Sequence, residues 1–433
     1  MCQHPFIPNP AALVASYLRT GIWDEWVLAH PIVLLSIPVL LTSFYTFDLY
    51  YPFKHFRGVE TAIDIVLAVV FGGFALAAVA YFDRSFLIAR PIFIFHLSFL
   101  AAFVFLTRMA YDFIFQSRFL DSRVLVVGTG PLAAQIANII RRTPHAGMDV
   151  VGFVGPDETG EIQHVNDTPV VGSISRLLSL ISWYNVQLVV LAMEPHQRMS
   201  ESDVMQALLK QPVKVTSATH LFEKLEGAIP YRLISEQDLL GLVAEVRARH
   251  YLKVKRIVDI FFSELLLILS LPVLILAALF LLLEGQYKVF FIQTRIGKDA
   301  RPFKLIKLRS MADGEDGEGK ITRIGKWLRK FRIDEIPQLV NVLKGDMSLV
   351  GPRPEIAYFV EKCREQIPLY DVVLTLRPGV TGWAQVKFYH VTSSRDYLQK
   401  FEYNLFYLKN ISLTLDLVII FKTIRTVLLG KGK

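Results

Sequence analysis

The sequence predicts a membrane protein of three parts: an N-terminal transmembrane helix bundle, a Rossmann-like α/β middle domain, and a C-terminal domain that begins with a long apolar helix. Three observations predict this class. Apolar residues form 53% of the 433-residue chain and the mean hydropathy is +0.40, above the norm for soluble proteins. Early in the chain, apolar stretches approach the roughly 20 residues that a spanning helix needs. Short β-branched runs then alternate with helix-like stretches.

The net charge limits the kinds of binding partner that the sequence predicts. A net charge of +8 favours anionic lipid and anionic substrate, because excess Lys and Arg of membrane proteins gather on the cytoplasmic side. No nucleic acid partner is expected, since no basic run is interleaved with base-stacking aromatics. The two cysteines, Cys2 and Cys363, exclude a disulfide framework and a cysteine metal site. The N-terminus lacks the pattern of a cleaved signal peptide.

Residues 1–118 form the predicted helix bundle. We expect spans at Pro31–Tyr50, Thr61–Phe82 and Pro91–Leu106. Basic residues follow the first and the last of these spans: Lys54, Arg57, Arg108, Arg118 and Arg123. They place the two segments that follow these spans in the cytoplasm. Residues 8–30 contain an apolar stretch that charged residues soon interrupt. Whether a fourth span lies there stays open.

Residues 119–245 change character. Strands are predicted at Arg123–Val127, Val150–Val154, Pro169–Val171 and Val186–Ala192, and helices follow Gly130 up to Arg142 and cover Ile174–Ile181. This rhythm predicts a Rossmann-like parallel sheet. The glycine turn at Gly128 and Gly130 is of the kind that binds phosphate. We favour the alternative of a tight strand-to-helix turn without a dinucleotide, because no acidic residue about 20 positions further on suits a ribose.

Residues 246–433 open with basic residues and an apolar stretch, Ile257–Leu283. Basic residues flank both ends of this stretch, so a spanning helix would carry one basic set across the membrane against the positive-inside tendency. Pro272 removes a backbone hydrogen bond near the middle, and Ser270 is close enough to satisfy freed backbone groups. A re-entrant helix that breaks at this point and returns is one interpretation, and an ordinary kinked transmembrane helix is the other.

Two basic side chains follow this helix in a strand-like block, residues 303–311. Lys307 and Arg309 are two positions apart, so they face the same side of a strand. Two convergent cations suit a diphosphate, and a solvated basic strand at the membrane surface is the alternative.

Asp334 and Glu335 are adjacent carboxylates ahead of Pro337. Neighbouring side chains of a helix point about 100° apart, so the two suit different tasks rather than a shared proton. Pro337 fits a first helical turn, which places the pair at a helix N-terminus where the dipole favours ionised carboxylates. An ionised Asp can attack phosphorus while a neighbouring carboxylate holds Mg²⁺, so this is one function that the pair suits. Simple capping of a helix is the alternative.

Arg353 lies between Pro352 and Pro354. The prolines restrict the backbone and fix the direction of the guanidinium, as a rigid phosphate clamp requires. A structural arginine in a turn is the alternative. Further on, Ile411–Leu429 is apolar but carries charges, which is typical of an interfacial amphipathic helix.

The run from Lys253 to Lys433 resembles the bacterial polyprenyl-phosphate glycosyl-1-phosphate transferases, the monotopic phosphoglycosyl transferases of exopolysaccharide and capsule assembly. The upstream regions resemble the larger subclass of that family. The resemblance rests on Lys255-Arg256-x-x-Asp259, Gln293-x-Arg295-x-Gly297, Lys307-Leu308-Arg309-Ser310-Met311, Arg332-Ile333-Asp334-Glu335-Ile336-Pro337-Gln338-Leu339, Asn341-Val342-Leu343-Lys344-Gly345-Asp346-Met347-Ser348, Val350-Gly351-Pro352-Arg353-Pro354 and Pro378-Gly379-x-Thr381-Gly382.

The resemblance implies a membrane enzyme whose helix at about 256–283 re-enters one leaflet. Asp334 would attack the β-phosphorus of a UDP-sugar, release UMP and form a phosphosugar-aspartate, and polyprenyl (undecaprenyl) phosphate would then accept the hexose-1-phosphate. Glu335 would help to bind the cofactor Mg²⁺. The residues expected to contact phosphate are Lys307, Arg309, Arg329 and Arg353.

The resemblance also implies a multi-pass protein of the bacterial inner membrane, in contact with membrane lipid, with the catalytic domain on the cytoplasmic face. Its reaction would be the first membrane step of exopolysaccharide, capsule or O-antigen synthesis. The sequence departs from the family at three places. Leu308 replaces an aromatic residue, Glu318-Gly319-Lys320 replaces Asp-x-Arg, and Leu271 separates Ser270 from Pro272.

Two other functions stay open: a membrane glycosyltransferase that releases UDP, and a regulatory membrane scaffold that senses a nucleotide. The nucleotide product separates the two enzymes. Glucose, galactose and N-acetylated hexosamines are all compatible with the sequence, and so is a homo-oligomer.

Overall fold

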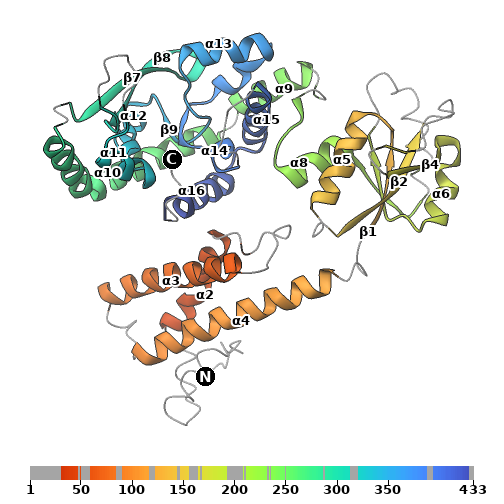
Figure 1. The fold of residues 1–433 in the computed structure, drawn as a ribbon, viewed down its shortest axis with the longest axis horizontal. Coiled ribbons are helices and arrows are strands. Elements are labelled where there is room, and N and C mark those ends of the chain that lie inside the picture. The colour runs from red at the N-terminus through yellow and green to blue at the C-terminus, as the bar shows by residue number, and fades with distance from the viewer. Residues whose placement is uncertain are drawn as a thin grey trace. The chain divides into compact units, whose positions relative to one another are not determined.

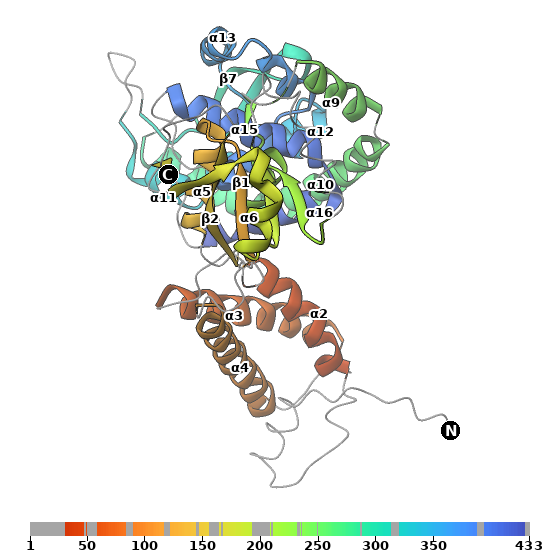
Figure 2. The ribbon, with the colours of Figure 1, turned by 90° about the vertical axis from the view of Figure 1, so that its right-hand side faces the viewer.

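The structure is a computed structural model with two compact units, Met1–Leu221 and Phe222–Lys433. It describes residues 31–46, 49, 59–83, 90–116, 122–143, 147–155, 164–165, 168–192, 208, 211–231, 234, 236–248, 250–285, 288–312, 320–387 and 394–428. Figure 1 and Figure 2 show its helices and strands from two directions. Helices and strands are mixed along the chain.

Three apolar helices open the first unit: α2 (Pro31–Thr46), α3 (Val59–Phe82) and α4 (Arg90–Gln116). Gly72 and Gly73 of α3 allow close packing, because a Cβ at either position would press on Leu40 of α2 or Leu97 of α4. Ser36 of α2 lies 3.2 Å from the His96 ring of α4. The helices therefore contact one another through small residues and through buried polar groups.

The predicted spans correspond to α2, α3 and α4, with two changes of length. The first ends at Thr46, before the predicted end at Tyr50. Pro91–Leu106 is part of α4, which continues to Gln116, so Arg108 lies within the helix and not after it. The reason is that no Gly or Pro follows Leu106 to end the helix. The predictions for residues 8–30 and for Lys54, Arg57 and Arg118 lie outside the described residues.

A six-stranded sheet follows, with strand order β3-β4-β2-β1-β5-β6. Its strands are β1 (Ser122–Val127), β2 (Met148–Gly155), β3 (His164–Val165), β4 (Thr168–Ser173), β5 (Leu188–Leu191) and β6 (Lys214–Ser217). All neighbours are parallel except β3 and β4, which form an antiparallel pair. The helices α5 (Pro131–Arg142) and α6 (Leu177–Trp183) lie on opposite sides of the sheet (Figure 1).

Sequence patterns predicted β1, β2, β4 and β5 to within a few residues but missed β3 and β6. Of these, β3 has two residues, and β6 has a largely exposed pattern without apolar alternation. At the end of β1, Gly128 has φ 122° and donates its N–H to Val154 O at 2.8 Å. Gly130 then caps α5 with Pro131 in its first turn. The glycine pair thus forms a tight strand-to-helix turn.

The second unit begins with α8 (Ala218–Glu226), which crosses the division between the units, and α9 (Glu236–Ala248). The chain between them packs on α15 (Ser394–Asn410), where Ile229 N–H bonds Glu402 O at 3.1 Å. Trp383 of α14 (Trp383–Lys387) donates its Nε1–H to Gly227 O at 2.6 Å. Residues 222–231 therefore belong structurally to this unit.

The helix α10 (Tyr251–Leu283) is the longest of the described helices, at 33 residues, and it continues through Ser270 and Pro272. It starts earlier than the predicted apolar stretch, because Lys253, Lys255 and Arg256 are good helix formers. Ser270 Oγ–H bonds Leu267 O at 3.1 Å. By length and composition, α10 and Asp64–Phe82 of α3 are the two described helices able to cross a membrane.

The ends of α10 are buried in the second unit and its middle is not. Lys255, Asp259 and Ser263 are buried near the start, and Ala277 and Leu281 near the end. No residue of 264–276 is buried. Leu267, Ser270 and Leu274 are partly buried and continue the line of buried residues from each end, while the other apolar side chains of this stretch are exposed. A helix of a soluble core has a fully buried stripe along its length. The middle of α10 therefore exposes more apolar surface than a helix of a soluble core.

The rest of the second unit surrounds two small sheets. An antiparallel hairpin joins β7 (Phe290–Ile296) and β8 (Pro302–Leu308), and β9 (Ser348–Val350) pairs in parallel with β10 (Gly379–Thr381). Around them pack α11 (Arg323–Lys330), α12 (Gln338–Lys344), α13 (Ala357–Gln366), α15 and α16 (Leu413–Leu428). The predicted C-terminal helix corresponds to α16, whose Asp416 is buried.

Candidate active site

Asp334 and Glu335 lie in a 3-10 helix, Ile333–Glu335, between α11 and α12. The turn begins at Arg332, whose φ of 53° lies in the left-handed region. For a residue other than glycine this conformation costs about 1–3 kcal/mol and is often found at functional sites. Pro337 is the N-cap of α12. The sequence placed the pair at the start of a helix, and the structure places it in the turn just before that helix.

Asp334 is buried, with 7% of its surface exposed. Burial raises the pKa of Asp334 to about 6, and the neighbouring charge of Glu335 adds to the rise. Lys307 and Arg329 oppose the rise and keep the pKa from climbing further. Burial thus acts against the ionised form that a helix dipole was expected to favour, and burial is the larger of the effects that shift this pKa. At neutral pH most Asp334 side chains are still ionised.

Glu335 contacts two arginines with its two carboxylate oxygens. Arg332 Nη1 lies 3.2 Å from Oε2, and Arg353 Nη1 lies 3.7 Å from Oε1. Only 15% of the Glu335 side chain is exposed, whereas 41% of the Arg353 side chain is exposed. The arginine therefore presents nitrogen atoms to solvent while its carboxylate partner stays fixed.

Lys307 is brought to the pair by β8. It is half-buried, and burial lowers its pKa, while the negative charges of Asp334 and Glu335 raise it. The Phe291 ring, across the hairpin, lies 5.0 Å from its ammonium. A lysine in this environment loses part of its hydration and is poised to bind an anion.

Asn341 of α12 fixes the strand that carries Lys307. Its Nδ2–H bonds Lys304 O at 2.7 Å, and its Oδ1 accepts the Ile306 N–H at 3.1 Å. Because Asn341 is only 1% exposed, these bonds have no competition from water. The helix after the carboxylates is thereby locked to the strand.

The loop that carries Arg353 rests on a close approach of two backbones. Gly351 N–H bonds Thr381 O at 2.9 Å, and Gly379 N–H bonds Pro352 O at 2.8 Å. A Cβ at Gly351, Gly379 or Gly382 would overlap backbone atoms of the facing segment. Arg295 holds the other side of the loop, donating to Pro354 O at 3.3 Å. The loop therefore holds the start of the Arg353 side chain rigidly.

The structure brings Lys307, Arg329 and Arg353 near the carboxylate pair, while their contact with phosphate stays a prediction. Arg309 lies one residue beyond the end of β8, so the strand alternation that grouped it with Lys307 stops short of it. Its backbone N–H bonds Val289 O at 2.8 Å. Three positions had no assigned role before: Arg295, Arg332 and Asn341. They lie in the quoted motifs, but only the tertiary contacts show what they touch.

Positive charge exceeds negative charge at this site. The cations Lys307, Arg329, Arg332 and Arg353 adjoin two carboxylates, Asp334 and Glu335, whereas Arg295 pairs with Glu355. Such a surplus stabilises an anion that carries several charges. The arrangement combines a buried carboxylate of raised pKa with cations suited to phosphate groups.

A family model described as "Bacterial sugar transferase" matches residues 250–430. A UDP-N-acetylgalactosamine-undecaprenyl-phosphate N-acetylgalactosaminephosphotransferase of Aeromonas hydrophila is 39% identical over 229 residues, which cover 51% of this chain and 53% of that protein. This chain thus spans about half the length of that relative. A UDP-glucose:undecaprenyl-phosphate glucose-1-phosphate transferase of Klebsiella pneumoniae is 28% identical over 400 residues, 86% of this chain and 83% of the relative. A putative undecaprenyl-phosphate N-acetylgalactosaminyl 1-phosphate transferase of Bacillus subtilis is 40% identical over 146 residues, 32% of this chain and 82% of that protein.

Proposed function

Because the chain belongs to the bacterial sugar transferase family, we propose that it transfers hexose-1-phosphate from a UDP-sugar to a polyprenyl phosphate. The names of two relatives, from Aeromonas and Klebsiella, include a UDP-sugar and undecaprenyl phosphate. The observation that carries the proposal is the buried Asp334 with its surrounding cations. The reaction would begin exopolysaccharide, capsule or O-antigen synthesis.

In the first step, an Asp334 carboxylate oxygen attacks the β-phosphorus of the UDP-sugar. A phosphorus–oxygen bond forms to the aspartate, and the bond from that phosphorus to the bridging oxygen breaks. UMP leaves with the electron pair, and the sugar phosphate stays on Asp334. The pKa of about 6 supports this role, since the carboxylate is mostly ionised at pH 7 but poorly solvated.

In the second step, an oxygen of the polyprenyl phosphate attacks the same phosphorus and displaces Asp334. The product is a polyprenyl diphospho-sugar, and the carboxylate is regenerated. Lys307, Arg329 and Arg353 would hold the charge of the phosphate groups in both steps, as would Arg309 if its side chain turns toward the site. The exposed guanidinium of Arg353 suits contact with the phosphate groups of the substrates, which enter and leave the site.

Mg²⁺ is the proposed cofactor, and the donor set fits it. Mg²⁺ binds through one or two carboxylates together with substrate phosphates, and Glu335 supplies a carboxylate beside the nucleophile. Among the described residues no group of three or more His, Cys, Asp or Glu side chains forms a cage. Donor phosphates would therefore complete the coordination. When bound, the ion neutralises charge on the diphosphate.

We also propose that α10 is re-entrant. Asp259 accepts the Leu349 N–H at 3.1 Å near the start of the helix, and Glu284, just beyond its end, accepts the Arg323 N–H at 2.7 Å. Both contacts are with the same compact unit, although the apolar middle between them is exposed. A helix that enters and leaves at one membrane face would account for both, with a bend at Pro272 instead of the expected break, since α10 is continuous there. The protein would then be a multi-pass inner-membrane protein with its catalytic unit on the cytoplasmic face.

The middle sheet supports a Rossmann-like domain. Its parallel order β4-β2-β1-β5-β6, with helices on both faces, is the pattern of a doubly wound fold. We propose no nucleotide for it. Activity of the fragment Phe222–Lys433 tests whether the domain senses a nucleotide that the reaction needs, and full turnover would argue against a regulatory requirement.

The nucleotide product tests the main proposal. The purified membrane protein is incubated with polyprenyl phosphate, Mg²⁺ and a panel of UDP-sugars, and the product is separated by anion exchange. UMP is expected in amounts equal to the lipid-linked sugar phosphate, and the panel identifies the sugar. Release of UDP would support the alternative glycosyltransferase instead. Asp334→Asn is expected to release no UMP while its thermal unfolding stays cooperative.

A further inference from the structure

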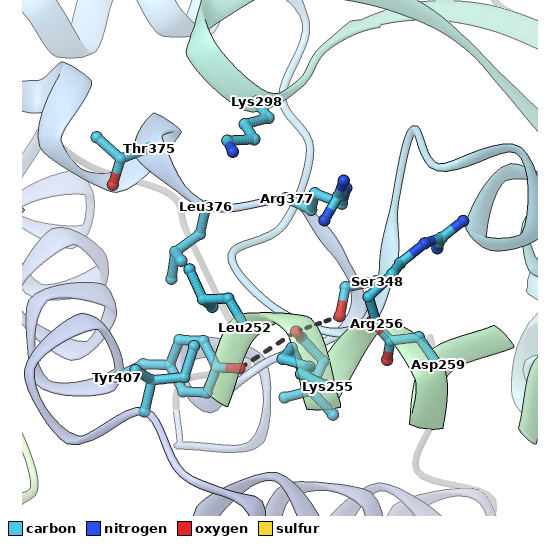
Figure 3. A pocket seen from close by; sticks show the side chains of 12 residues that line it. Leu252, Lys255, Arg256, Asp259, Lys298, Ser348, Thr375, Leu376, Arg377 and Tyr407 are labelled. Carbon is cyan, nitrogen blue, oxygen red and sulfur yellow. Dashed lines mark hydrogen bonds between the residues drawn. The ribbon is translucent and has the colours of Figure 1, made fainter. Parts of the chain in front are cut away.

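A cavity of about 80 Å³ lies in the second unit, at the start of α10 and away from the turn that carries Asp334. Figure 3 shows its lining, with Lys298 reaching in from the turn between β7 and β8. Its walls include Leu252, Leu376 and Ile411, and its cations include Arg256, Lys298 and Arg377. One water needs about 10–15 Å³ on this scale, so the cavity accommodates a group of several oxygen atoms such as a phosphate.

Two arginines of the cavity are fixed by the far end of α12. Arg256 donates to Val342 O at 2.6 Å and to Leu343 O at 3.0 Å. Arg377 donates through Nε to Gly345 O at 3.0 Å. These carbonyls lie at the end of α12, where Val342 O also accepts the Gly345 N–H at 3.0 Å, so the bonds cap the helix and hold both guanidiniums in place. Among the residues that the structure describes, Arg377 bonds through Nε alone, which leaves its two terminal nitrogens for a ligand.

The carboxylates at the cavity are already engaged. Asp259 accepts the Leu349 N–H at 3.1 Å, and Asp416, behind the wall, pairs with Lys255 and accepts the hydroxyls of Tyr251 and Tyr407. Within the described residues, Lys298 and Arg377 form no ion pair. The cavity therefore has a positive surplus that an anion would balance.

The cavity lies at the depth of lipid headgroups if α10 enters the membrane. Ile257 already belongs to the exposed apolar surface of α10, because it is 69% exposed. Leu252 in the cavity wall precedes Ile257 by five residues, or about 7 Å along the helix. The headgroup layer on each side of a bilayer is about 5–8 Å thick. A lipid phosphate would reach the cations while its chains stay beside α10.

We propose that this cavity binds the phosphate of an anionic phospholipid headgroup. The cations Lys298 and Arg377 contact the phosphate oxygens, and Leu252 and Ile411 contact the first carbons of the lipid. The bound headgroup fixes the height of the catalytic unit on the membrane. A free phosphate ion has the same charge chemistry but lacks the apolar part, so the two ligands are separable by experiment.

The test uses the full-length protein in detergent. Its thermal unfolding midpoint is followed during titration with dihexanoyl phosphatidylglycerol, with dihexanoyl phosphatidylcholine and with inorganic phosphate. Phosphatidylglycerol is expected to raise the unfolding midpoint in a saturable way, at concentrations at least fivefold lower than the other two. Inorganic phosphate that acts at the same concentration as the lipid would overturn the lipid assignment. Phosphatidylcholine that matches phosphatidylglycerol would overturn the role of charge.

Variants connect the effect to the cavity. Lys298→Gln and Arg377→Lys are each expected to raise the concentration of phosphatidylglycerol needed for half the effect at least fivefold. Lys344→Gln is the matched control, because Lys344 is an exposed cation of the same unit that does not line the cavity. Equal lipid responses in the wild type, Lys298→Gln and Arg377→Lys would overturn the proposal. If Arg377→Lys weakens the cap of α12, Lys298→Gln still tests the cavity, because Lys298 is not part of that cap.

Asp334→Asn separates this inference from the proposed function. That variant is expected to respond to phosphatidylglycerol as the wild type does, although it releases no UMP. A lost lipid response in Asp334→Asn would place the lipid at the carboxylate pair and overturn the separate site.

Discussion

Asn341 Nδ2 lies 2.7 Å from Lys304 O, a hydrogen bond that ties the helix after the carboxylate pair to the strand before Lys307. The second bond of the amide, from Ile306 N–H to Oδ1 at 3.1 Å, makes the contact two-sided. Two segments that are 37 residues apart are thus held in one register. The distance between the nucleophile candidate and its nearest lysine depends on this amide.

Replacement of Asn341 should therefore impair both stability and activity. Asn341→Ala leaves the Ile306 N–H and the Lys304 carbonyl without their partner, at a cost of up to about 1–3 kcal/mol. We expect a lower unfolding midpoint and, at a temperature well below it, a UMP release rate reduced at least tenfold. Asn410→Ala removes a side-chain bond to Glu223 remote from the site and should keep its rate within twofold. A normal rate in Asn341→Ala would contradict the positioning role.

The pH dependence of UMP release should report the pKa of Asp334. The carboxylate reacts and the acid does not, so with a pKa of about 6 the reactive fraction falls about tenfold for each pH unit below 6. Single-turnover UMP release without acceptor lipid should be flat above about pH 7 and should fall with unit slope below pH 6. A profile that stays flat to pH 4 would place the pKa near its ordinary value and contradict the effect of burial.

The stability of the folded protein should also depend on the ionisation of Asp334, and it should change with pH in the direction opposite to the rate. The folded pKa of Asp334 lies above its ordinary value of 3.8, so ionisation costs the folded state and stability falls as pH rises from about 4 to about 6. Asp334→Asn does not ionise and lacks this loss. The unfolding midpoint of the variant relative to the wild type should therefore increase between pH 4 and pH 7. A constant difference would argue against a raised pKa.

The sequence predicted the local elements better than the contacts between them. The length of the apolar stretches predicted α3 to within two residues and the end of α10, because this signal is local. The start of α10 was missed by six residues, and the helix continues through Pro272, where a break was expected. The burial of Asp334 was not predicted, because it arises from packing of its turn against α11 and β8 and no short sequence pattern encodes it. The approach of Arg295 to Pro354 likewise joins positions 59 residues apart. Helix and strand propensities and hydrophobic periodicity are local signals, so they do not predict burial or pairing between residues far apart in the chain.

Arg353 is expected to matter for its shape as well as its charge. Its guanidinium is 3.7 Å from Glu335 and 41% exposed, so it is free to form bidentate bonds with a phosphate. Arg353→Lys keeps the charge but loses the fork, and a lost charged hydrogen bond is worth about 1.5–3 kcal/mol, or about 10–150-fold in kcat/KM. Arg364→Lys, in a surface pair with Asp371, should stay within twofold. Equal losses in the two variants would contradict a specific phosphate contact.

Removal of Mg²⁺ should stop UMP release, and Glu335→Gln should weaken the response to the ion. The neutral amide keeps the size of the side chain but is a poorer ligand for a hard cation. We expect the Mg²⁺ concentration for half-maximal rate to rise at least tenfold, while Glu361→Gln on α13 leaves it unchanged. A normal Mg²⁺ response in Glu335→Gln would assign the ion to Asp334 and the donor phosphates alone.

Cysteine labelling should decide the topology of α10. Lys253 lies near its start and Lys288 beyond its end, and both side chains are exposed. Lys253→Cys and Lys288→Cys are each made in a chain that also carries Cys2→Ser and Cys363→Ala. If the helix re-enters one leaflet, a membrane-impermeant maleimide added to spheroplasts labels neither position, and the same reagent labels both in inverted vesicles. Labelling of one position from each side would show that α10 spans the membrane. The positive-inside tendency favours the first outcome, because crossing would move either the basic residues before Ile257 or those after Leu283 to the far side.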